Sequence, residues 1–259
     1  MNVKVIKIGG NVVDNPEKLE KFLRDFATIK GAKILVHGGG KIATQISKSV
    51  GIEAQMIDGR RVTDAETLKV VIMVYAGLIN KNIVAKLRSE NVDAIGMCGA
   101  DGGLIVSNKR KPNPVDYGYV GDPIIDNFSV KTAKMYIDNE YTMVVAPITI
   151  STENELLNTN ADTIASTIAQ ALAKEYETEL VYCFEKRGVL TDVNDDNSVI
   201  SEITPSYFEQ LKSEGVIVDG MLPKLTNAFK AIDNGVAKVV ICSSEAVAEP
   251  GYGGTTLVK

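Results

Sequence analysis

Two glycine-rich loops, each placed directly after a short apolar segment, limit the fold of this chain more than any other feature. Residues 3–8 run into the pair Gly9-Gly10, and residues 33–37 run into Gly38-Gly39-Gly40. Amphipathic segments follow both loops. Short apolar runs that alternate with helical periodicity indicate parallel strands covered by helices. The N-terminal part therefore predicts two successive β-loop-α units.

The same alternation continues to the C-terminus without an internal repeat. The 259 residues are 45% apolar and 24% charged, so a sizeable core is available. We predict an α/β fold with a central, mainly parallel sheet. Helices are expected at 16–29, 41–50, 65–87, 130–139, 161–174, 205–213 and 223–234, and strands at 3–8, 33–37, 93–97, 143–146, 180–184 and 238–242. A boundary near 176–178 would divide the chain into lobes 1–176 and 177–259.

The charge balance and the hydropathy pattern exclude several classes of partner. The 28 Lys+Arg and 33 Asp+Glu give a formal charge of −5, which repels a nucleic-acid backbone. The one basic run, 109–111, precedes two prolines and is typical of a solvated loop, so we assign it no role. The longest nearly apolar run, 70–79, is about half of the ~20 residues that span a bilayer. We expect neither nucleic acid nor a membrane as a partner.

The cysteines and the N-terminus indicate a cytoplasmic protein. Cys98, Cys183 and Cys242 each end an apolar run and lack the spacing of a metal or redox motif, which favours buried thiols in a reducing compartment. Residues 1–7 contain lysines and lead straight into glycines, unlike a secretory signal.

Both glycine loops suit a phosphate group. In the first loop, Lys7 precedes Gly9-Gly10, so backbone N–H groups can approach an anion beside an ammonium group. The second loop leads into a helix whose N-terminus carries partial positive charge. Either loop alone is equally well explained as a tight strand-to-helix turn. Their presence on consecutive strands favours ligand binding, because ligands of parallel sheets gather at the carboxyl ends of the strands.

A nicotinamide-dependent oxidoreductase is the main alternative. Gly38, Gly40 and Ala43 fit the dinucleotide fingerprint, and Asp58 lies at about the distance where an acid meets a ribose hydroxyl. That fingerprint normally occupies the first βα turn of its domain, whereas an earlier strand here already carries Lys7 and a glycine pair. A non-catalytic nucleotide-sensing module is a third alternative.

Three later segments supply further polar groups. The segment 58–63 contains Arg61, whose guanidinium group can hold a carboxylate bidentately, while Arg60 is better explained as an exposed arginine. In 158–162, an asparagine cap and an acidic first turn explain only part of the polar residues. In 219–224, a turn and a helix start leave the side chain of Lys224 unexplained.

Five blocks in order then carry a resemblance that covers residues 4–258. They are KIGGN at 7–11, VHGGGK at 36–41, DGRRVT at 58–63, NTNAD at 158–162 and DGMLPK at 219–224. The chain resembles the amino acid kinase family, and within it the members that act on N-acylated glutamate. This resemblance implies an αβα sandwich of the carbamate kinase-like type, with an N-terminal lobe for the acyl amino acid and for dimerisation, and a C-terminal lobe for ATP with Mg²⁺.

The implied reaction moves the γ-phosphoryl group of ATP onto the γ-carboxylate of N-acetyl-L-glutamate or a close analogue such as N-succinyl-L-glutamate, in arginine biosynthesis. Related kinases that act on other acidic amino acids share the glycine loops and remain an alternative. A carboxylate is already ionised at neutral pH, because its reference pKa is about 4.3, so this chemistry needs no general base. We therefore interpret His37, the single histidine, as structural or as a support for its glycine loop.

The resemblance also assigns roles to residues. Lys7 and Lys224 are implied to stabilise the transferring phosphoryl group, with Asp162 holding both lysines. The implied substrate ligands are Gly38, Gly39, Gly40, Arg61, Asn158 and Asn160, and the implied ATP ligands are Gly9, Gly10 and Gly188 together with the two lysines. No protein metal ligands are implied, because Mg²⁺ often binds chiefly through phosphate oxygens and water.

Two features depart from the family pattern. Relatives carry a Thr-Asp-Val-x-Gly type of turn after the first strand of the nucleotide lobe, whereas residues 183–188 read CFEKRG, are one residue longer and place Glu185 near the expected aspartate. The extension helix of arginine-inhibited, hexameric relatives does not precede the first strand. We therefore expect a homodimer without arginine feedback, with 65–87 as a dimer helix or, equally, a core helix.

Overall fold

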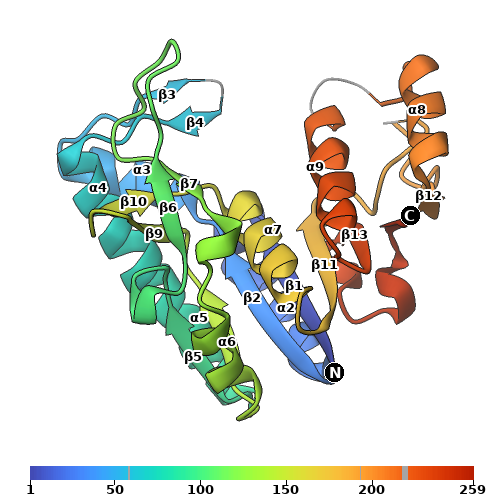
Figure 1. Ribbon diagram of the computed structural model, residues 1–259, viewed down its shortest axis with the longest axis horizontal. Coiled ribbons are helices and arrows are strands. Elements are labelled where there is room, and N and C mark those ends of the chain that lie inside the picture. Colours follow the sequence, from blue (N-terminus) through green and yellow to red (C-terminus); the bar gives the residue numbers. More distant parts are fainter. Residues whose placement is uncertain (58, 193, 218–220) are drawn as a thin grey trace.

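The computed structural model describes residues 1–57, 59–192, 194–217 and 221–259. Within them, one eight-stranded sheet has the order β12-β14-β13-β11-β1-β2-β8-β5 (Figure 1). Its strands are β1 Asn2–Ile8, β2 Ala32–His37, β5 Ala94–Met97, β8 Thr142–Val145, β11 Glu177–Phe184, β12 Glu202–Ile203, β13 Lys238–Ser243 and β14 Thr255–Leu257. Every neighbouring pair is parallel except β13 and β14. The predicted α/β fold with a mainly parallel sheet is confirmed.

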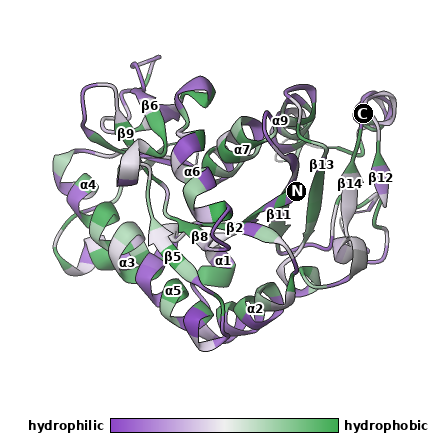
Figure 2. Cartoon of the chain, turned by 60° about the horizontal axis from the view of Figure 1, so that its bottom comes forward, coloured by the Kyte–Doolittle hydropathy of each residue, from purple (hydrophilic) through white to green (hydrophobic). Residues whose placement is uncertain are grey.

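Helices cover both faces of this sheet, as Figure 2 shows. One face carries α1 Gly10–Val13, α2 Pro16–Thr28, α3 Gly40–Ser49, α4 Ala65–Ile72 and α5 Asn80–Ser89, and the other carries α6 Val130–Ile137, α7 Ala161–Leu172, α8 Pro205–Ser213 and α9 Leu222–Asp233. Side chains of β1 alternate between two apolar cores, with Val5 on the side of α7 and Ile6 on the side of α2. The architecture is therefore an αβα sandwich.

Short polar side chains fix where several of these helices begin. The residue before the first turn accepts a hydrogen bond from the backbone N–H three residues further on, which satisfies a donor that the helix itself leaves free. Asn15, Asp64, Ser129, Asn160 and Thr204 all act in this way. Thr204 is the cap that the sequence predicts for α8.

A second, smaller sheet was not predicted. It has the order β10-β9-β6-β7, and its strands are β6 Val106–Lys109, β7 Gly121–Pro123, β9 Ile148–Ser151 and β10 Leu156–Asn158. The hairpin of β3 Met56–Ile57 and β4 Arg60–Arg61 lies close to it in Figure 1. Strands of two to four residues are too short to show a hydrophobic period, which explains the omission.

The predicted helix 65–87 is one continuous helix over Ala65–Ser89, with a π-helical stretch at Met73–Ile79. It is the one helix among the described residues that is long and apolar enough to cross a membrane, by length and composition only. A buried core helix passes the same test, and this helix contributes Val70, Val74, Ile83 and others to the core on its side of the sheet.

The expected lobe boundary falls at the start of β11, which begins at Glu177. Strands that follow this point occupy one half of the sheet, and strands that precede it occupy the other half, with β11 next to β1 at the junction. The sheet itself is continuous across the boundary. The division into a substrate lobe and a nucleotide lobe stays a prediction.

Candidate active site

The site lies where β1, β2 and β11 end side by side. Lys7 in β1 is in register with Val36 in β2 and with Tyr182 in β11, so the loops that follow the three strands emerge at one edge of the sheet. A Cβ atom on Gly38 would lie 3.6 Å from the backbone nitrogen of Gly10. The two glycine loops are therefore in contact.

Lys7 and Asp162 form the central ion pair. The Nζ atom of Lys7 lies 2.6 Å from Oδ1 of Asp162, and their side chains are 9% and 35% exposed. Asp162 stands in the first turn of α7, where the helix dipole favours a carboxylate. The hydroxyl of Tyr182 donates to the backbone oxygen of Asp162 at 3.2 Å, which fixes this turn against β11. The structure therefore brings together two of the three predicted catalytic residues by a direct contact.

Lys224, the third predicted catalytic residue, contacts the same aromatic ring as Lys7. Its Nζ atom lies 4.0 Å from the centroid of the Phe184 ring, and Nζ of Lys7 lies 5.3 Å from the same centroid. A ring face attracts a cation within about 6 Å. Among the described residues Asp162 pairs with Lys7 and forms no ion pair with Lys224. The implied role of Asp162 in holding both lysines stays a prediction. The block 219–224 lies partly outside the described residues.

Two cavities meet at Phe184 and Lys224. The larger has a volume of about 580 Å³ and is lined by all of the predicted substrate ligands, namely Gly38, Gly39, Gly40, Arg61, Asn158 and Asn160. The smaller has a volume of about 280 Å³, and its walls include Gly9, Gly188 and Lys224 of the predicted ATP ligands. Gly10 lines the larger cavity instead, and Lys7 lies behind the wall that Asp162 and Phe184 form.

Arg61 is held so that part of its guanidinium group remains free. It is 7% exposed, and its Nη2 atom donates to the oxygen of Gly40 at 2.9 Å and to Oγ1 of Thr44 at 2.7 Å. Its Nη1 atom is buried and has no hydrogen-bond partner. Asn158 lies in the same wall, and its Nδ2 atom donates to Oγ1 of Thr63 at 3.0 Å. Arg60 is exposed, as predicted.

Gly39 is the position where the second loop tolerates no side chain. Its φ is +148°, and a Cβ atom there would lie 2.2 Å from Cδ1 of Ile79, at the end of the π-helical stretch. Asn160 has a structural role as well as a place in the cavity wall, because its side chain accepts a hydrogen bond from the N–H of Thr163 at 3.0 Å and caps α7.

His37 is fully buried beneath the second glycine loop. Its Nδ1 atom lies 2.9 Å from the oxygen of Gly38, and its Nε2 atom lies 3.2 Å from Nδ2 of Asn80. Burial lowers the pKa of His37 to about 4, so the ring is neutral at pH 7 and Nδ1–H donates to Gly38. These contacts confirm that His37 supports the loop.

This depressed pKa predicts acid sensitivity. Because the unfolded chain binds a proton near pH 6.5 and the folded chain only near pH 4, His37 stabilises the fold above pH 6.5 and this contribution is lost as the pH falls toward 4. We expect wild type to lose about 2 kcal/mol more free energy of unfolding between pH 7 and pH 5 than His37→Gln. Urea unfolding at both pH values measures the difference, and equal losses in the two proteins would contradict it.

Several residues of the site were missed by sequence reasoning. Tyr75 and Arg110 line the larger cavity, and burial raises the pKa of Tyr75 while the neighbouring Arg61 opposes the shift. Asn11 joins three loops, because its side chain accepts from Nζ of Lys41 and donates to the carboxylate of Glu185. π-Helical stretches are often found at functional sites. The periodicity of the sequence does not reveal that Tyr75 lies in such a stretch.

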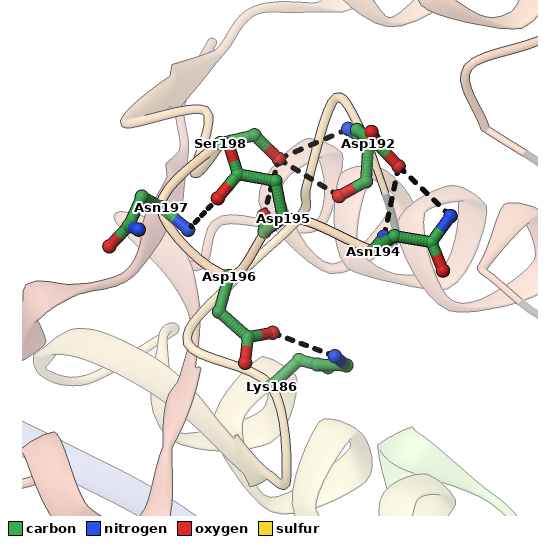
Figure 3. Close-up of polar contacts among 7 residues, drawn as sticks. All are labelled: Lys186, Asp192, Asn194, Asp195, Asp196, Asn197 and Ser198. Carbon is green, nitrogen blue, oxygen red and sulfur yellow. Dashed lines mark hydrogen bonds and ion pairs between the residues drawn. The ribbon is translucent and has the colours of Figure 1, made fainter.

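The loop after Gly188 closes on itself (Figure 3). Asp192 and Asp195 accept hydrogen bonds at 2.9 Å from the N–H groups of Asn194 and Asn197, and Asp196 pairs with Lys186 at 2.7 Å. The described residues include no group of three His, Cys, Asp or Glu side chains that could hold a metal ion.

Gly188 is required by packing, since a Cβ atom there would lie 2.6 Å from Oγ1 of Thr255.

The αβα sandwich, with two lysine amines against an aromatic ring that two cavities share, indicates a phosphotransferase. The chain belongs to the amino acid kinase family, whose profile matches residues 2–243. It is 56% identical to the acetylglutamate kinase of Cytophaga hutchinsonii over 95% of this chain and 92% of that protein. The solved structure of smu.665 from Streptococcus mutans is 26% identical with a TM-score of 0.75, covering 99% of this chain and 98% of that one. Carbamate kinase from Giardia lamblia shares the fold at 15% identity, with a TM-score of 0.69 and coverage of 99% and 98%.

Proposed function

We propose that this kinase transfers the γ-phosphoryl group of ATP to the γ-carboxylate of N-acetyl-L-glutamate, or of a close N-acyl analogue, in arginine biosynthesis. One observation carries the proposal: the amines of Lys7 and Lys224 face one aromatic ring, Phe184, at the junction of two cavities. A substrate in the larger cavity and a nucleotide in the smaller one would meet there. Relatives at high identity that carry the name acetylglutamate kinase support the substrate.

In this proposal the larger cavity orients the acyl amino acid. The free Nη1 atom of Arg61, with Asn158 beside it, receives the α-carboxylate, and Gly38-Gly39-Gly40 supply the loop against which the substrate lies. The γ-carboxylate then points toward Lys7 and Lys224. One carboxylate oxygen forms a bond to the γ-phosphorus as the bond from that phosphorus to the β–γ bridging oxygen breaks, so ADP leaves and no proton is transferred.

The two lysines act on the charge of the transferring group. Phosphoryl transfer spreads negative charge over three equatorial oxygens, and fixed cations lower its barrier by electrostatic stabilisation. Lys7 is suited to this task because Asp162 holds its amine in one place. Gly9, Gly10 and Gly188 would approach ATP, and the smaller cavity, with two glycines and two lysines in its wall, fits a phosphate chain. Mg²⁺ would be held by phosphate oxygens and water.

The family assignment favours the kinase over the oxidoreductase. Ala43 of the dinucleotide-like pattern is buried in the core, and Asp58, the acid of that alternative, lies outside the described residues. A coupled ADP-release assay over N-acylated and free acidic amino acids tests the proposal. We expect turnover with N-acyl-L-glutamates alone. Turnover with a free acidic amino acid would reassign the substrate, and ATP binding without any turnover would identify a nucleotide sensor.

We further propose a cytoplasmic homodimer, with residues 1–176 as the substrate lobe and 177–259 as the nucleotide lobe. The three cysteines carry free thiols, which suits a reducing compartment. The π-helical stretch exposes Met73 and Leu78, which are 60% and 48% exposed, on the side away from the sheet. Exposed large apolar side chains on one helix favour a protein interface.

The dimer proposal predicts the effect of a charge on that helix. Leu78→Lys is expected to convert a dimer to a monomer, raising the dissociation constant by about tenfold or more, because an ammonium group would be buried unpaired. Light scattering after size-exclusion chromatography measures the mass. Met135→Lys is the matched control, since Met135 is 54% exposed on α6 in the opposite layer. A monomeric wild type would reject the proposal.

A further inference from the structure

Arg110 lines the larger cavity, although the basic run to which it belongs is typical of a solvated loop. It directly follows β6, and its backbone N–H donates to the oxygen of Val120 at 2.8 Å, so it extends the pairing of β6 with β7 by one residue. Neighbouring residues of an extended segment point to opposite sides, which leaves Lys109 and Lys111 exposed and turns Arg110 inward.

The Arg110 guanidinium group is fixed with one edge unused. Its Nε atom donates to both carboxylate oxygens of Asp122 at 3.1 Å, and its Nη2 atom is also bonded to Asp122. The ring of Tyr117 lies 5.7 Å from its central carbon. The remaining nitrogen, Nη1, is buried and has no hydrogen-bond partner. Arg61, in the same cavity, also leaves its Nη1 atom without a partner.

Each of the two arginines therefore keeps one nitrogen that a substrate group in the cavity can use. In the proposed function the γ-carboxylate faces Lys7 and Lys224, and the α-carboxylate faces Arg61. The wall that carries Arg110 adjoins the α-carboxylate site, because the N–H of Asn158 donates to the oxygen of Tyr119 at 2.9 Å and Val120 pairs with Asn158. The substituent of glutamate that remains for this wall is the acyl group on its nitrogen.

We infer that Arg110 receives a second carboxylate, carried by the acyl group, so that the substrate is N-acylated by a dicarboxylic acid of the succinyl class in preference to acetyl. This inference rests on the proposed function and deepens it. Asp122 does not cancel the interaction, because it occupies Nε and Nη2 and its side chain is 48% exposed, so water screens its charge. A hydrogen bond from an arginine to a carboxylate also depends on the orientation of the donor N–H groups. The contacts to Asp122 fix that orientation for Arg110.

The test compares three substrates with wild type, Arg110→Met and Lys111→Met. The substrates are N-succinyl-L-glutamate, N-acetyl-L-glutamate and N-succinamoyl-L-glutamate, the neutral amide of the same length as the first. Wild type is expected to show kcat/KM at least about tenfold higher for the succinyl substrate than for the other two, as a charge-assisted hydrogen bond would give. Arg110→Met should lose that preference, so that its kcat/KM for the succinyl substrate falls to its value for the acetyl substrate, and Lys111→Met, which removes an adjacent exposed charge, should keep the preference.

The outcomes separate this inference from the proposed function. Equal or higher kcat/KM for the acetyl substrate in wild type overturns the inference and leaves the kinase assignment intact. A preference that survives in Arg110→Met also overturns it. If Arg110→Met fails to fold in a thermal unfolding measurement, the wild-type comparison of the succinyl and succinamoyl substrates decides, because they differ in a charge and not in length. Absence of turnover with all three substrates would reject the proposed function itself.

Discussion

Replacing Lys7 or Lys224 by alanine is expected to lower kcat by about 10²- to 10³-fold while the fold survives, as loss of one transition-state donor typically does. Removing Lys7 deprives Asp162 of its partner, but that side chain is 35% exposed and water can solvate it. Lys224 is exposed and contacts Phe184 through its amine, so its removal leaves no buried charge behind. Coupled ADP release at saturating substrates measures kcat, and circular dichroism checks the fold.

Lys33→Ala is the matched control for Lys7→Ala. Lys33 is buried like Lys7, but it lies at the other end of the sheet, where its amine donates to the carbonyl oxygens of Phe26, Ala27 and Ile29 at the end of α2. Its loss should lower the melting temperature and leave kcat of the folded enzyme unchanged. If Lys7→Ala and Lys33→Ala affect kcat equally, Lys7 acts through stability and not on the phosphoryl group.

Arg61→Met is expected to raise KM for the acyl amino acid by about 10²-fold, because it removes charge-assisted hydrogen bonds to the α-carboxylate. The value of kcat should change by only a few fold, since the γ-carboxylate still meets the lysines once the substrate is bound. KM for ATP should stay constant. Initial rates over both substrate concentrations measure all three values.

Arg24→Met provides the control for Arg61, because Arg24 is exposed on α2 and pairs only with Glu20 among the described residues. It should leave every kinetic constant unchanged. An Arg61→Met enzyme whose loss appears in kcat alone would show that Arg61 orients the reacting group and does not hold the α-carboxylate.

The main layers of the fold follow from local patterns, whereas the cavity wall does not. Helix α8 occupies Pro205–Ser213 as predicted, because Thr204 caps it and Pro205 suits the first turn. Strands β7 and β10 have three residues each, and their pairing depends on partners far along the chain. The wall that they build next to Asn158 could therefore not be predicted from periodicity.

The candidate site likewise contains residues that local sequence patterns predict and residues that they do not. Lys7, Asp162 and the glycine loops were predicted because each lies in a block with a recognisable local pattern, and the structure places them together. Arg110 was assigned to a solvated loop because nearby prolines and two lysine neighbours dominate its local sequence, while its orientation depends on the distant Val120. Tyr75 was missed because the π-helical stretch changes which side chains of the helix face the loop at Gly39.

The most direct test of the two-lysine mechanism is a crystal structure with ADP, Mg²⁺, aluminium fluoride and an N-acyl-L-glutamate. The planar fluoride group occupies the position of the transferring phosphoryl group. We predict that the amines of Lys7 and Lys224 both lie within about 3 Å of its fluorine atoms, with Lys7 still paired to Asp162. If either amine instead faces bulk solvent or the adenosine end of the nucleotide, the account is wrong.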